Sequence, residues 1–340
     1  MKSVVIEEPG KVRVYERAEP QIKSDEVLLE IQYIGLCGSD LSTYRGLSPL
    51  VTFPRIPGHE VSGVIINKGA NVPHTFNMGD KVTVNPYTSC GVCPACRAAR
   101  VNTCEFNQTL GVQRDGALSR YFAIHHNKVL KSNILTAKEF SLVEPLSVGY
   151  HAANRGQVTE MDTVLVIGCG MIGIGAIIAS IRKGATVIAI DPDDQKLELV
   201  KSFGARYTFN ANEPDMVKRI KEITNDEGVN VCIEAVGTPS TYILAVDAVA
   251  FAGRVVYIGY AKKEVQFNTS LFVKKELTIY GSRNVLFEFR PVIQMLEERI
   301  IPFEKLISKI YPINETPLAF KQWDTTPGDF IKILIDVRDR

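Results

Sequence analysis

From about residue 160, short apolar segments alternate with segments of helical pattern, and this alternation constrains the fold more than any other feature of the sequence. The apolar segments include TVLVIG, ATVIAID, NVCIEAVG and RVVYIGY, and helical segments such as DQKLELVKSFG separate them. Strand and helix in alternation predict a doubly wound parallel sheet built of right-handed βαβ units. The fold class is therefore α/β.

The first 130 residues have a different pattern. Strand-like segments such as EVLLEIQYIG nearly alternate apolar and polar residues, and Gly, Pro and Asn separate them. This pattern predicts a β-rich domain. The last helical and strand-like segments, RPVIQMLEERI and FIKILIDV, have no place in the alternating half. We therefore expect residues 1–150 and 282–340 to form one domain and residues 151–281 to form the other.

A glycine-rich turn lies at the start of the alternating half. Residues 168–173, GCGMIG, match G-x-G-x-x-G between a predicted strand and a predicted helix, which is typical of the Rossmann dinucleotide-binding fold. Asp191 ends the next strand, 23 positions after Gly168, where an acid binds the ribose 2′-hydroxyl and disfavours a 2′-phosphate. NAD is thus favoured over NADP. The candidate cofactor contacts are Gly168, Gly170, Met171, Ile172, Gly173, Asp191 and Gly259.

Four of the seven cysteines lie between residues 90 and 104 in the spacing C-x2-C-x2-C-x7-C. Four thiolates from one loop make a closed tetrahedral zinc site of the structural kind. An iron–sulfur cluster and four unrelated thiols are the alternatives. Because protein sulfur fills a closed site, we do not expect the chemistry to occur there. The predicted ligands of this structural zinc are Cys90, Cys93, Cys96 and Cys104.

The charge balance argues against two classes of partner. The chain has 39 basic and 38 acidic residues, a formal net charge of +1, and no basic run, so neither a nucleic acid nor an anionic membrane is an expected partner. The N-terminus, MKSVVIEEPG, lacks the apolar core of a secretory signal, and we expect a cytoplasmic protein. The uncharged residues 163–181 approach the length of a membrane span, but their glycines favour a strand, turn and helix.

Four further candidates lie far apart in the sequence: Cys37 in GLCGSD, His59 and Glu60 in PGHE, and Glu144 in VEPLSVGYHA. Together with the cysteine cluster and the glycine turn, these segments resemble the zinc-dependent medium-chain dehydrogenase/reductase family over nearly the whole chain. The motifs CGSD, YRG, GHE and GSRN are most similar to the branch of sorbitol, L-threonine and sugar-acid dehydrogenases. The resemblance implies a GroES-like catalytic domain, with a structural-zinc lobe at residues 88–106, beside the Rossmann domain.

The resemblance also implies a second, catalytic zinc, which makes two zinc ions per chain. Cys37 and His59 would bind it, and the remaining protein ligand would come from Glu60 or Glu144; the sequence leaves both open. Such an ion with an open position acidifies an alcohol, whose hydride passes to the nicotinamide.

Neighbouring residues would support that chemistry. By the resemblance, Asp40 holds the far nitrogen of His59, and Ser39 takes the alcohol proton. Two positions depart from the family pattern. Ser42 stands where many relatives have a histidine that completes the proton path, and serine does not titrate near neutrality. Arg120 stands where relatives usually have an acid, and the sequence gives no functional account of it.

The substrate is indicated by the segment GSRN. Arg283 can bind a carboxylate through two parallel hydrogen bonds, or it can bind cofactor phosphate or an interface acid instead. Asn284 beside it and Tyr44 in YRG are further candidate substrate contacts. We expect an NAD-dependent oxidation of a secondary hydroxyl of a sugar acid or polyol, a small polyhydroxy molecule. The alternatives are an L-threonine or amino-alcohol dehydrogenase and a catalytically silent ligand- or nucleic-acid-binding protein. By the resemblance, the protein is a homodimer or homotetramer.

Overall fold

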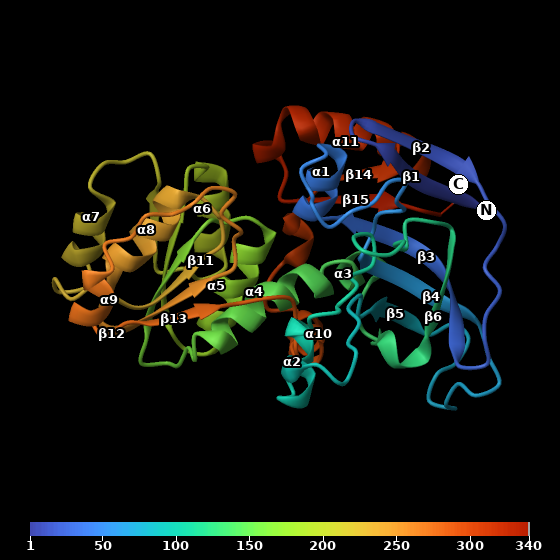
Figure 1. Ribbon diagram of the computed structural model, residues 1–340, viewed down its shortest axis with the longest axis horizontal. Helices are drawn as coiled ribbons and strands as arrows, with labels where there is room; N and C mark the ends of the chain where they lie inside the picture. The colour runs from blue at the N-terminus through green and yellow to red at the C-terminus, as the bar shows by residue number, and fades with distance from the viewer. Residues whose placement is uncertain (339–340) are drawn as a thin grey trace. The chain divides into compact units, whose positions relative to one another are not determined.

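The computed structural model describes residues 1–338, and the chain divides into two compact units (Figure 1). Unit 1 comprises Met1–Glu144 and the chain from Phe289 onwards, and unit 2 comprises Pro145–Glu288. The division near residue 144 lies inside helix α4, Val143–Arg155. The sequence placed that boundary at 150 because a helix gives no break in pattern where one unit ends and the next begins.

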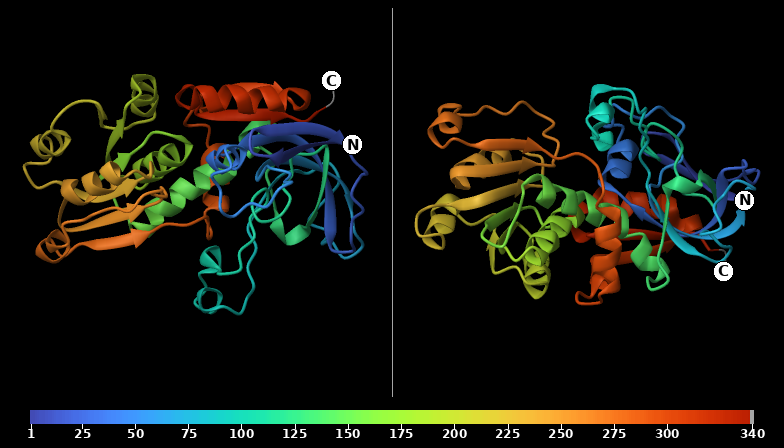
Figure 2. Two further views of the ribbon diagram at one scale, coloured as in Figure 1. Left: turned by 45° about the horizontal axis from the view of Figure 1, so that its top comes forward. Right: turned by 90° about the horizontal axis from the view of Figure 1, so that it is seen from below.

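Unit 2 contains a six-stranded parallel sheet with the strand order β10-β9-β8-β11-β12-β13. Helices cover both faces of this sheet (Figure 2), so the α/β fold class predicted from the alternation is confirmed. The winding reverses at β8, the point at which such sheets bind dinucleotides at the carboxyl ends of their strands. The strands are β8 (Thr163–Ile167), β9 (Thr186–Asp191), β10 (Tyr207–Asn210), β11 (Val229–Glu234), β12 (Val249–Tyr257) and β13 (Thr278–Gly281). The helices are α5 (Met171–Arg182), α6 (Asp194–Ser202), α7 (Met216–Glu222), α8 (Pro239–Ala248) and α9 (Ser270–Lys274).

Unit 1 is the β-rich part of the chain. Its main sheet has seven strands, in the order β14-β15-β3-β4-β5-β7 with β6 also paired to β3, and β1 and β2 form a separate hairpin. The strands are β1 (Lys2–Glu8), β2 (Lys11–Glu16), β3 (Glu26–Leu36), β4 (Glu60–Lys68), β5 (Lys81–Val84), β6 (Tyr121–His125), β7 (Val129–Lys131), β14 (Ile307–Pro312) and β15 (Lys332–Asp336). The helices are α1 (Gly38–Tyr44), α2 (Pro94–Arg97), α3 (Ala137–Phe140), α10 (Phe289–Glu297) and α11 (Thr316–Thr325), together with the start of α4.

The C-terminal segment completes the sheet of unit 1. Strand β15 lies beside β3 (Figure 1) and pairs with it antiparallel, with Leu334 opposite Gly35. Helix α11 contributes the fully buried Phe320 to the same core. Burying one such side chain stabilises the fold by about 1.5–3 kcal/mol. The last strand thus fixes the position of β3, whose carboxyl end leads directly to Cys37.

Candidate active site

Cys37 lies at the junction of a strand and a helix. Strand β3 ends at Leu36, and Cys37 is the N-cap of α1. The backbone N–H of Cys37 donates to Asp40 Oδ2 at 2.9 Å. A short acidic side chain in the first turn of a helix can accept this bond and stabilise the helix start. Asp40 therefore fixes the backbone from which the Cys37 thiol projects.

His59 and Glu60 reach the same place at the start of β4, the neighbour of β3: His59 directly precedes the strand, and Glu60 is its first residue. Glu60 pairs opposite Gly35 in the sheet, where a Cβ on Gly35 would lie 2.0 Å from Glu60 Oε2. Only glycine leaves room for this carboxylate. Cys37, His59 and Glu60 each bring one ligand atom within 4.8 Å of the others. Sulfur, imidazole nitrogen and carboxylate oxygen are the ligands that zinc takes, and three protein ligands leave a fourth position for a substrate.

A buried lysine, which the sequence analysis missed, holds Glu60. Lys332 Nζ on β15 donates to both carboxylate oxygens of Glu60 at 2.6 Å and to the Leu36 carbonyl at 2.9 Å. The side chains of Lys332 and Glu60 are 3% and 0% exposed. The lysine thereby neutralises a carboxylate that would be costly to bury alone.

Glu144 lies in the first turn of α4 and is buried. It accepts a hydrogen bond from the Tyr87 hydroxyl. Burial raises the pKa of Glu144, and burial together with this carboxylate raises the pKa of Tyr87 well above its ordinary value. Glu144 is not among the residues whose ligand atoms gather within 4.8 Å. Of the two candidate carboxylates, Glu60 is the one that lies with Cys37 and His59.

Three buried polar atoms at this site have no hydrogen-bond partner within residues 1–338: Ser39 Oγ, Asp40 Oδ1 and His59 Nδ1. The expected hydrogen bond from His59 to Asp40 is therefore not present, and Asp40 binds the backbone of Cys37 instead. Burial lowers the pKa of His59, but the neighbouring Cys37 and Asp40 raise it by more, to well above its ordinary value. Unpartnered lone pairs, such as those that Asp40 Oδ1 and a neutral His59 can offer, fit a bound cation.

Two other sequence candidates lie in packed surroundings. Tyr44, a candidate substrate contact, stacks on Phe320 with ring centroids 5.3 Å apart. Arg120 donates to Glu30 Oε1 at 2.6 Å and to the Val337 carbonyl at 3.4 Å. Arg120 therefore ties β3 to the C-terminal strand region, which gives a structural account of the position that the sequence left unexplained.

The four clustered cysteines converge. Their sulfur atoms all lie within 4.8 Å of one another, and the Sγ–Sγ distances Cys90–Cys96 and Cys93–Cys104 are both 3.9 Å. Sulfur atoms about 2.3 Å from a tetrahedral zinc lie about 3.8 Å apart, whereas a disulfide needs about 2.05 Å. Backbone amides of Cys96 and Glu105 hold the pKa of Cys93 at about 6. The cluster has the geometry of four sulfur ligands around one ion.

The glycine turn of unit 2 forms an open cradle. Gly168 has φ +97°, which a glycine adopts without strain, and a Cβ on Gly173 would lie 1.8 Å from the Gly168 carbonyl oxygen. Gly170 is the N-cap of α5, and a Cβ there would meet no atom within 4 Å. Met171 and Ile172 form the first turn of α5, whose N–H groups have no acceptor inside the helix. These amides are suited to a pyrophosphate.

Asp191 supports this cradle. It is the last residue of β9, and its carboxylate accepts from Cys169 N at 2.7 Å and from Asp193 N at 3.0 Å. Its position, at the end of the strand that follows the glycine turn, is that of a ribose-binding acid.

Gly259 follows β12, and a Cβ on it would lie 2.3 Å from Gly237 N. The glycine therefore permits a close approach of two loops at the carboxyl ends of β11 and β12.

Arg283 and Asn284 follow β13 at the same carboxyl edge of the sheet of unit 2. Asn284 has φ +54°, in the left-handed region that asparagine tolerates better than most residues. Both side chains are half-buried.

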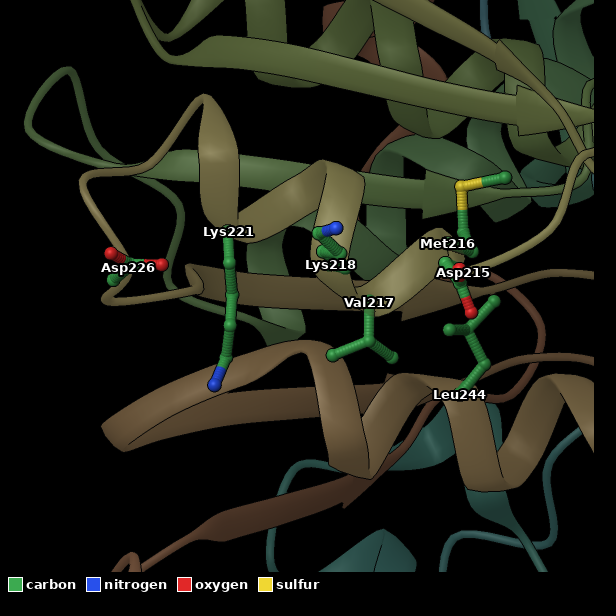
Figure 3. A pocket seen from close by; sticks show the side chains of 7 residues that line it. All are labelled: Asp215, Met216, Val217, Lys218, Lys221, Asp226 and Leu244. Atoms are coloured by element: carbon green, nitrogen blue, oxygen red, sulfur yellow. The ribbon is translucent and has the colours of Figure 1, made fainter.

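A separate cavity of about 660 Å³ lies beside α7 and α8 and is lined by Met216, Lys218, Lys221 and Leu244 among others (Figure 3). None of the residues singled out from the sequence lines it. Among residues 1–338, no helix has both the length and the apolar character needed to cross a membrane.

Comparisons with known proteins agree with this arrangement. Residues 23–134 match the alcohol dehydrogenase GroES-like domain, and residues 172–298 match the zinc-binding dehydrogenase family. An uncharacterized zinc-type alcohol dehydrogenase-like protein of Haemophilus influenzae is 35% identical over 98% of both chains. The chain belongs to the zinc-type alcohol dehydrogenase family.

Two other relatives of this dehydrogenase carry named activities. Sorbitol dehydrogenase of Bacillus subtilis is 32% identical over 98% of this chain and 97% of its own. L-Galactonate-5-dehydrogenase of Escherichia coli is 30% identical over 92% of both chains. The predicted class of enzyme, an oxidoreductase acting on alcohols of small molecules, is confirmed.

Solved structures extend the comparison to cofactors. An Escherichia coli CFT073 alcohol dehydrogenase complexed with NADH has a TM-score of 0.92, 30% identity and 99% coverage of both chains. Galactitol-1-phosphate dehydrogenase from Escherichia coli has a TM-score of 0.91 and 30% identity, covering 99% of this chain and 100% of that one. A zinc-binding dehydrogenase from Sinorhizobium meliloti 1021 bound to NADP has a TM-score of 0.92 and 26% identity, with 99% coverage of both chains. Zinc and a nicotinamide cofactor are thus supported for this dehydrogenase.

Proposed function

We propose that this dehydrogenase oxidises a secondary hydroxyl of a sugar acid or polyol to the ketone, with NAD as the hydride acceptor and zinc at the site of Cys37, His59 and Glu60. The observation that carries the proposal is the convergence of the half-buried Cys37 with the buried His59 and Glu60, each with one ligand atom within 4.8 Å of the others. Three protein ligands without a fourth leave a position for an alcohol oxygen.

Each residue of the site has a distinct task in this proposal. Cys37, His59 and Glu60 hold the ion, and Glu144 lies outside the ligand set as a neighbouring carboxylate. A zinc ion bound there would supply the Lewis acidity that acidifies the alcohol, while the nicotinamide accepts the hydride. Ser39 Oγ, which is buried and has no partner among the described residues, takes the hydroxyl proton. Because the Ser42 side chain cannot titrate near neutrality, that proton leaves through water.

The proposal includes a second zinc ion and a preference for NAD. The sulfur positions of the four-cysteine cluster support a structural zinc with no open position. The carboxylate of Asp191 at the end of β9 supports NAD, because it repels the 2′-phosphate of NADP.

Arg283 supports an acidic substrate. Its guanidinium can bind a carboxylate through two parallel hydrogen bonds, and one relative is named for its action on L-galactonate. Asn284 beside it offers an amide for a neutral hydroxyl. These two residues would distinguish a sugar acid from a neutral polyol such as sorbitol.

We also propose that the protein is a homo-oligomer joined at β13. This strand is at the edge of the sheet of unit 2, and its Ile279 is 41% exposed. Val273, on the preceding helix α9, is 85% exposed. An open edge with apolar residues around it is a ready surface for another strand. Size-exclusion chromatography with light scattering would test this, and a monomer at micromolar concentration would contradict it.

The first experiment is a substrate panel. The purified protein is mixed with NAD or NADP and with aldonates, polyols, polyol phosphates or L-threonine, and formation of reduced nicotinamide is followed. We expect one aldonate to give the highest kcat/KM, and Arg283→Ala to remove that preference while NAD affinity stays unchanged. Arg290→Ala is the matched control, because this exposed arginine lies on α10 of unit 1. Equal loss on acidic and neutral substrates would instead assign Arg283 to the cofactor or to an interface.

A further inference from the structure

The carboxylate of Glu288 has the most complete set of hydrogen bonds in unit 2 outside the regions discussed above. Its Oε1 lies 2.9 Å from His151 Nδ1 and accepts from Asn154 Nδ2 at 2.9 Å. Its Oε2 accepts from the backbone N–H groups of Leu286 and Phe287, each at 2.9 Å. One buried carboxylate thereby joins helix α4 to the chain segment that follows β13.

These four contacts use the whole acceptor capacity of the carboxylate, which is about four sites. Glu288 is 4% exposed and His151 is 2% exposed, so water does not compete for them. Burial raises the pKa of Glu288, but hydrogen bonds from His151 and Asn154 outweigh it and hold the pKa at about 2. Glu288 is therefore an anion at neutral pH with no acceptor site left for a substrate or a metal ion.

The segment that Glu288 anchors is the one that carries Arg283 and Asn284. Residues 282–288 have no regular secondary structure between β13 and α10. At one end, Ser282 N donates to the Tyr257 carbonyl at 2.9 Å. At the other end, the Glu288 carboxylate binds the segment's own amides. Between the two anchors the chain passes through the left-handed conformation of Asn284.

We infer that Glu288 is a positioning residue that holds residues 282–288 in the conformation that presents Arg283 and Asn284 to the substrate. This inference rests on the proposed function, because it takes Arg283 as a substrate contact. His151 and Asn154 lie three positions apart on one face of α4, which is how a helix directs two donors to one acceptor. Helix α4 thus fixes the Glu288 carboxylate, and the carboxylate in turn fixes residues 282–288 through their backbone amides.

The test measures two properties separately: how well residues 282–288 are ordered, and how well the enzyme recognises its substrate. Glu288→Gln replaces one acceptor oxygen by a donor, and Asn154→Ala removes one donor and is the milder change. Hydrogen exchange of the Leu286 and Phe287 amides reports order directly, and steady-state kinetics with the preferred aldonate report recognition. Glu297→Gln is the matched control, because this glutamate accepts from Ser132 within unit 1.

We expect both variants to speed exchange at residues 286 and 287 about tenfold or more, to raise KM for the aldonate about tenfold, and to change kcat less than about threefold. Arg283→Ala should raise KM equally and leave exchange unchanged. If hydrogen exchange at residues 286 and 287 is unchanged in Glu288→Gln, the inference is overturned. It is also overturned if Arg283→Ala raises KM for the aldonate while Glu288→Gln speeds exchange but leaves that KM unchanged. If Arg283→Ala leaves KM unchanged, the proposed substrate contact fails, and the exchange rates alone decide whether Glu288 orders the segment. If Glu288→Gln does not fold, Asn154→Ala decides by the same two readouts.

Discussion

Removing the ammonium group of Lys332 is the sharpest test of how the candidate zinc site is built. Lys332→Met keeps an unbranched side chain of similar length but deletes three hydrogen bonds, two of them to Glu60 at 2.6 Å. The partners are almost fully buried, so Glu60 is left as an uncompensated anion in the core of unit 1. Breaking a buried pair from one side costs about 3–5 kcal/mol, and we expect a loss of this size in zinc-free protein.

Zinc should reduce that loss. If Glu60 binds the ion, zinc supplies a cation in place of the lysine, so zinc should stabilise Lys332→Met more than it stabilises the unchanged protein. The double variant Lys332→Met/Glu60→Gln should be more stable than Lys332→Met without zinc, because neither charge is then left alone.

The single tryptophan makes the assay specific to unit 1. Trp323 lies on α11 and packs against the core of that unit. Urea unfolding followed by its fluorescence, with zinc and with a chelator, gives the stability of unit 1 in each variant. A loss below about 1 kcal/mol for Lys332→Met in chelator, or a double variant no more stable than the single one, would refute this account of the pair.

Four further outcomes follow from the structure. Cys104→Ser should lower bound zinc from two ions per chain to one, measured by elemental analysis, and two remaining ions would contradict a four-thiolate site. The pKa of Glu288 is held at about 2, below its ordinary value, so its contribution to stability is complete above about pH 4.5 and is lost as the pH falls towards 2. The free energy of unfolding of Glu288→Gln, measured by urea unfolding at several pH values, should therefore change less between about pH 4.5 and pH 2 than that of the unchanged protein. Asp191→Ala should raise the KM for NAD and improve the relative use of NADP, measured by steady-state kinetics. Arg120→Leu should cost about 0.5–1 kcal/mol in urea unfolding without changing kcat, because its pair with Glu30 is partly exposed.

The features that the sequence predicted well are local ones. The cysteine cluster and the glycine turn each place their chemistry within a few neighbouring residues, so spacing alone indicates the geometry. The alternation of strands and helices predicted the parallel sheet for the same reason, because each βαβ unit is encoded in a continuous segment.

The missed residues depend on contacts between distant parts of the chain. Lys332 lies 272 positions from Glu60, and Glu288 lies 137 positions from His151. A signal for Lys332 was present, since it interrupts the apolar run FIKILIDV, in which a charge needs a buried partner. The hydrogen bond expected between Asp40 and His59 was wrong for a different reason. Asp40 lies three positions from Cys37 and accepts from the backbone amide of that nearby residue instead.

The four-cysteine lobe differs from the rest of unit 1 in what maintains its shape. Helix α2, which carries Cys96, has four residues and none of them is buried, so apolar packing contributes little there. We expect a loop of this kind to depend on a bound ion for its fold. When zinc is scarce, we expect this segment to open first and become a site of cleavage by proteases, while the sheets stay folded. The lifetime of the enzyme would then follow the zinc supply through a segment to which we assign no role in the reaction.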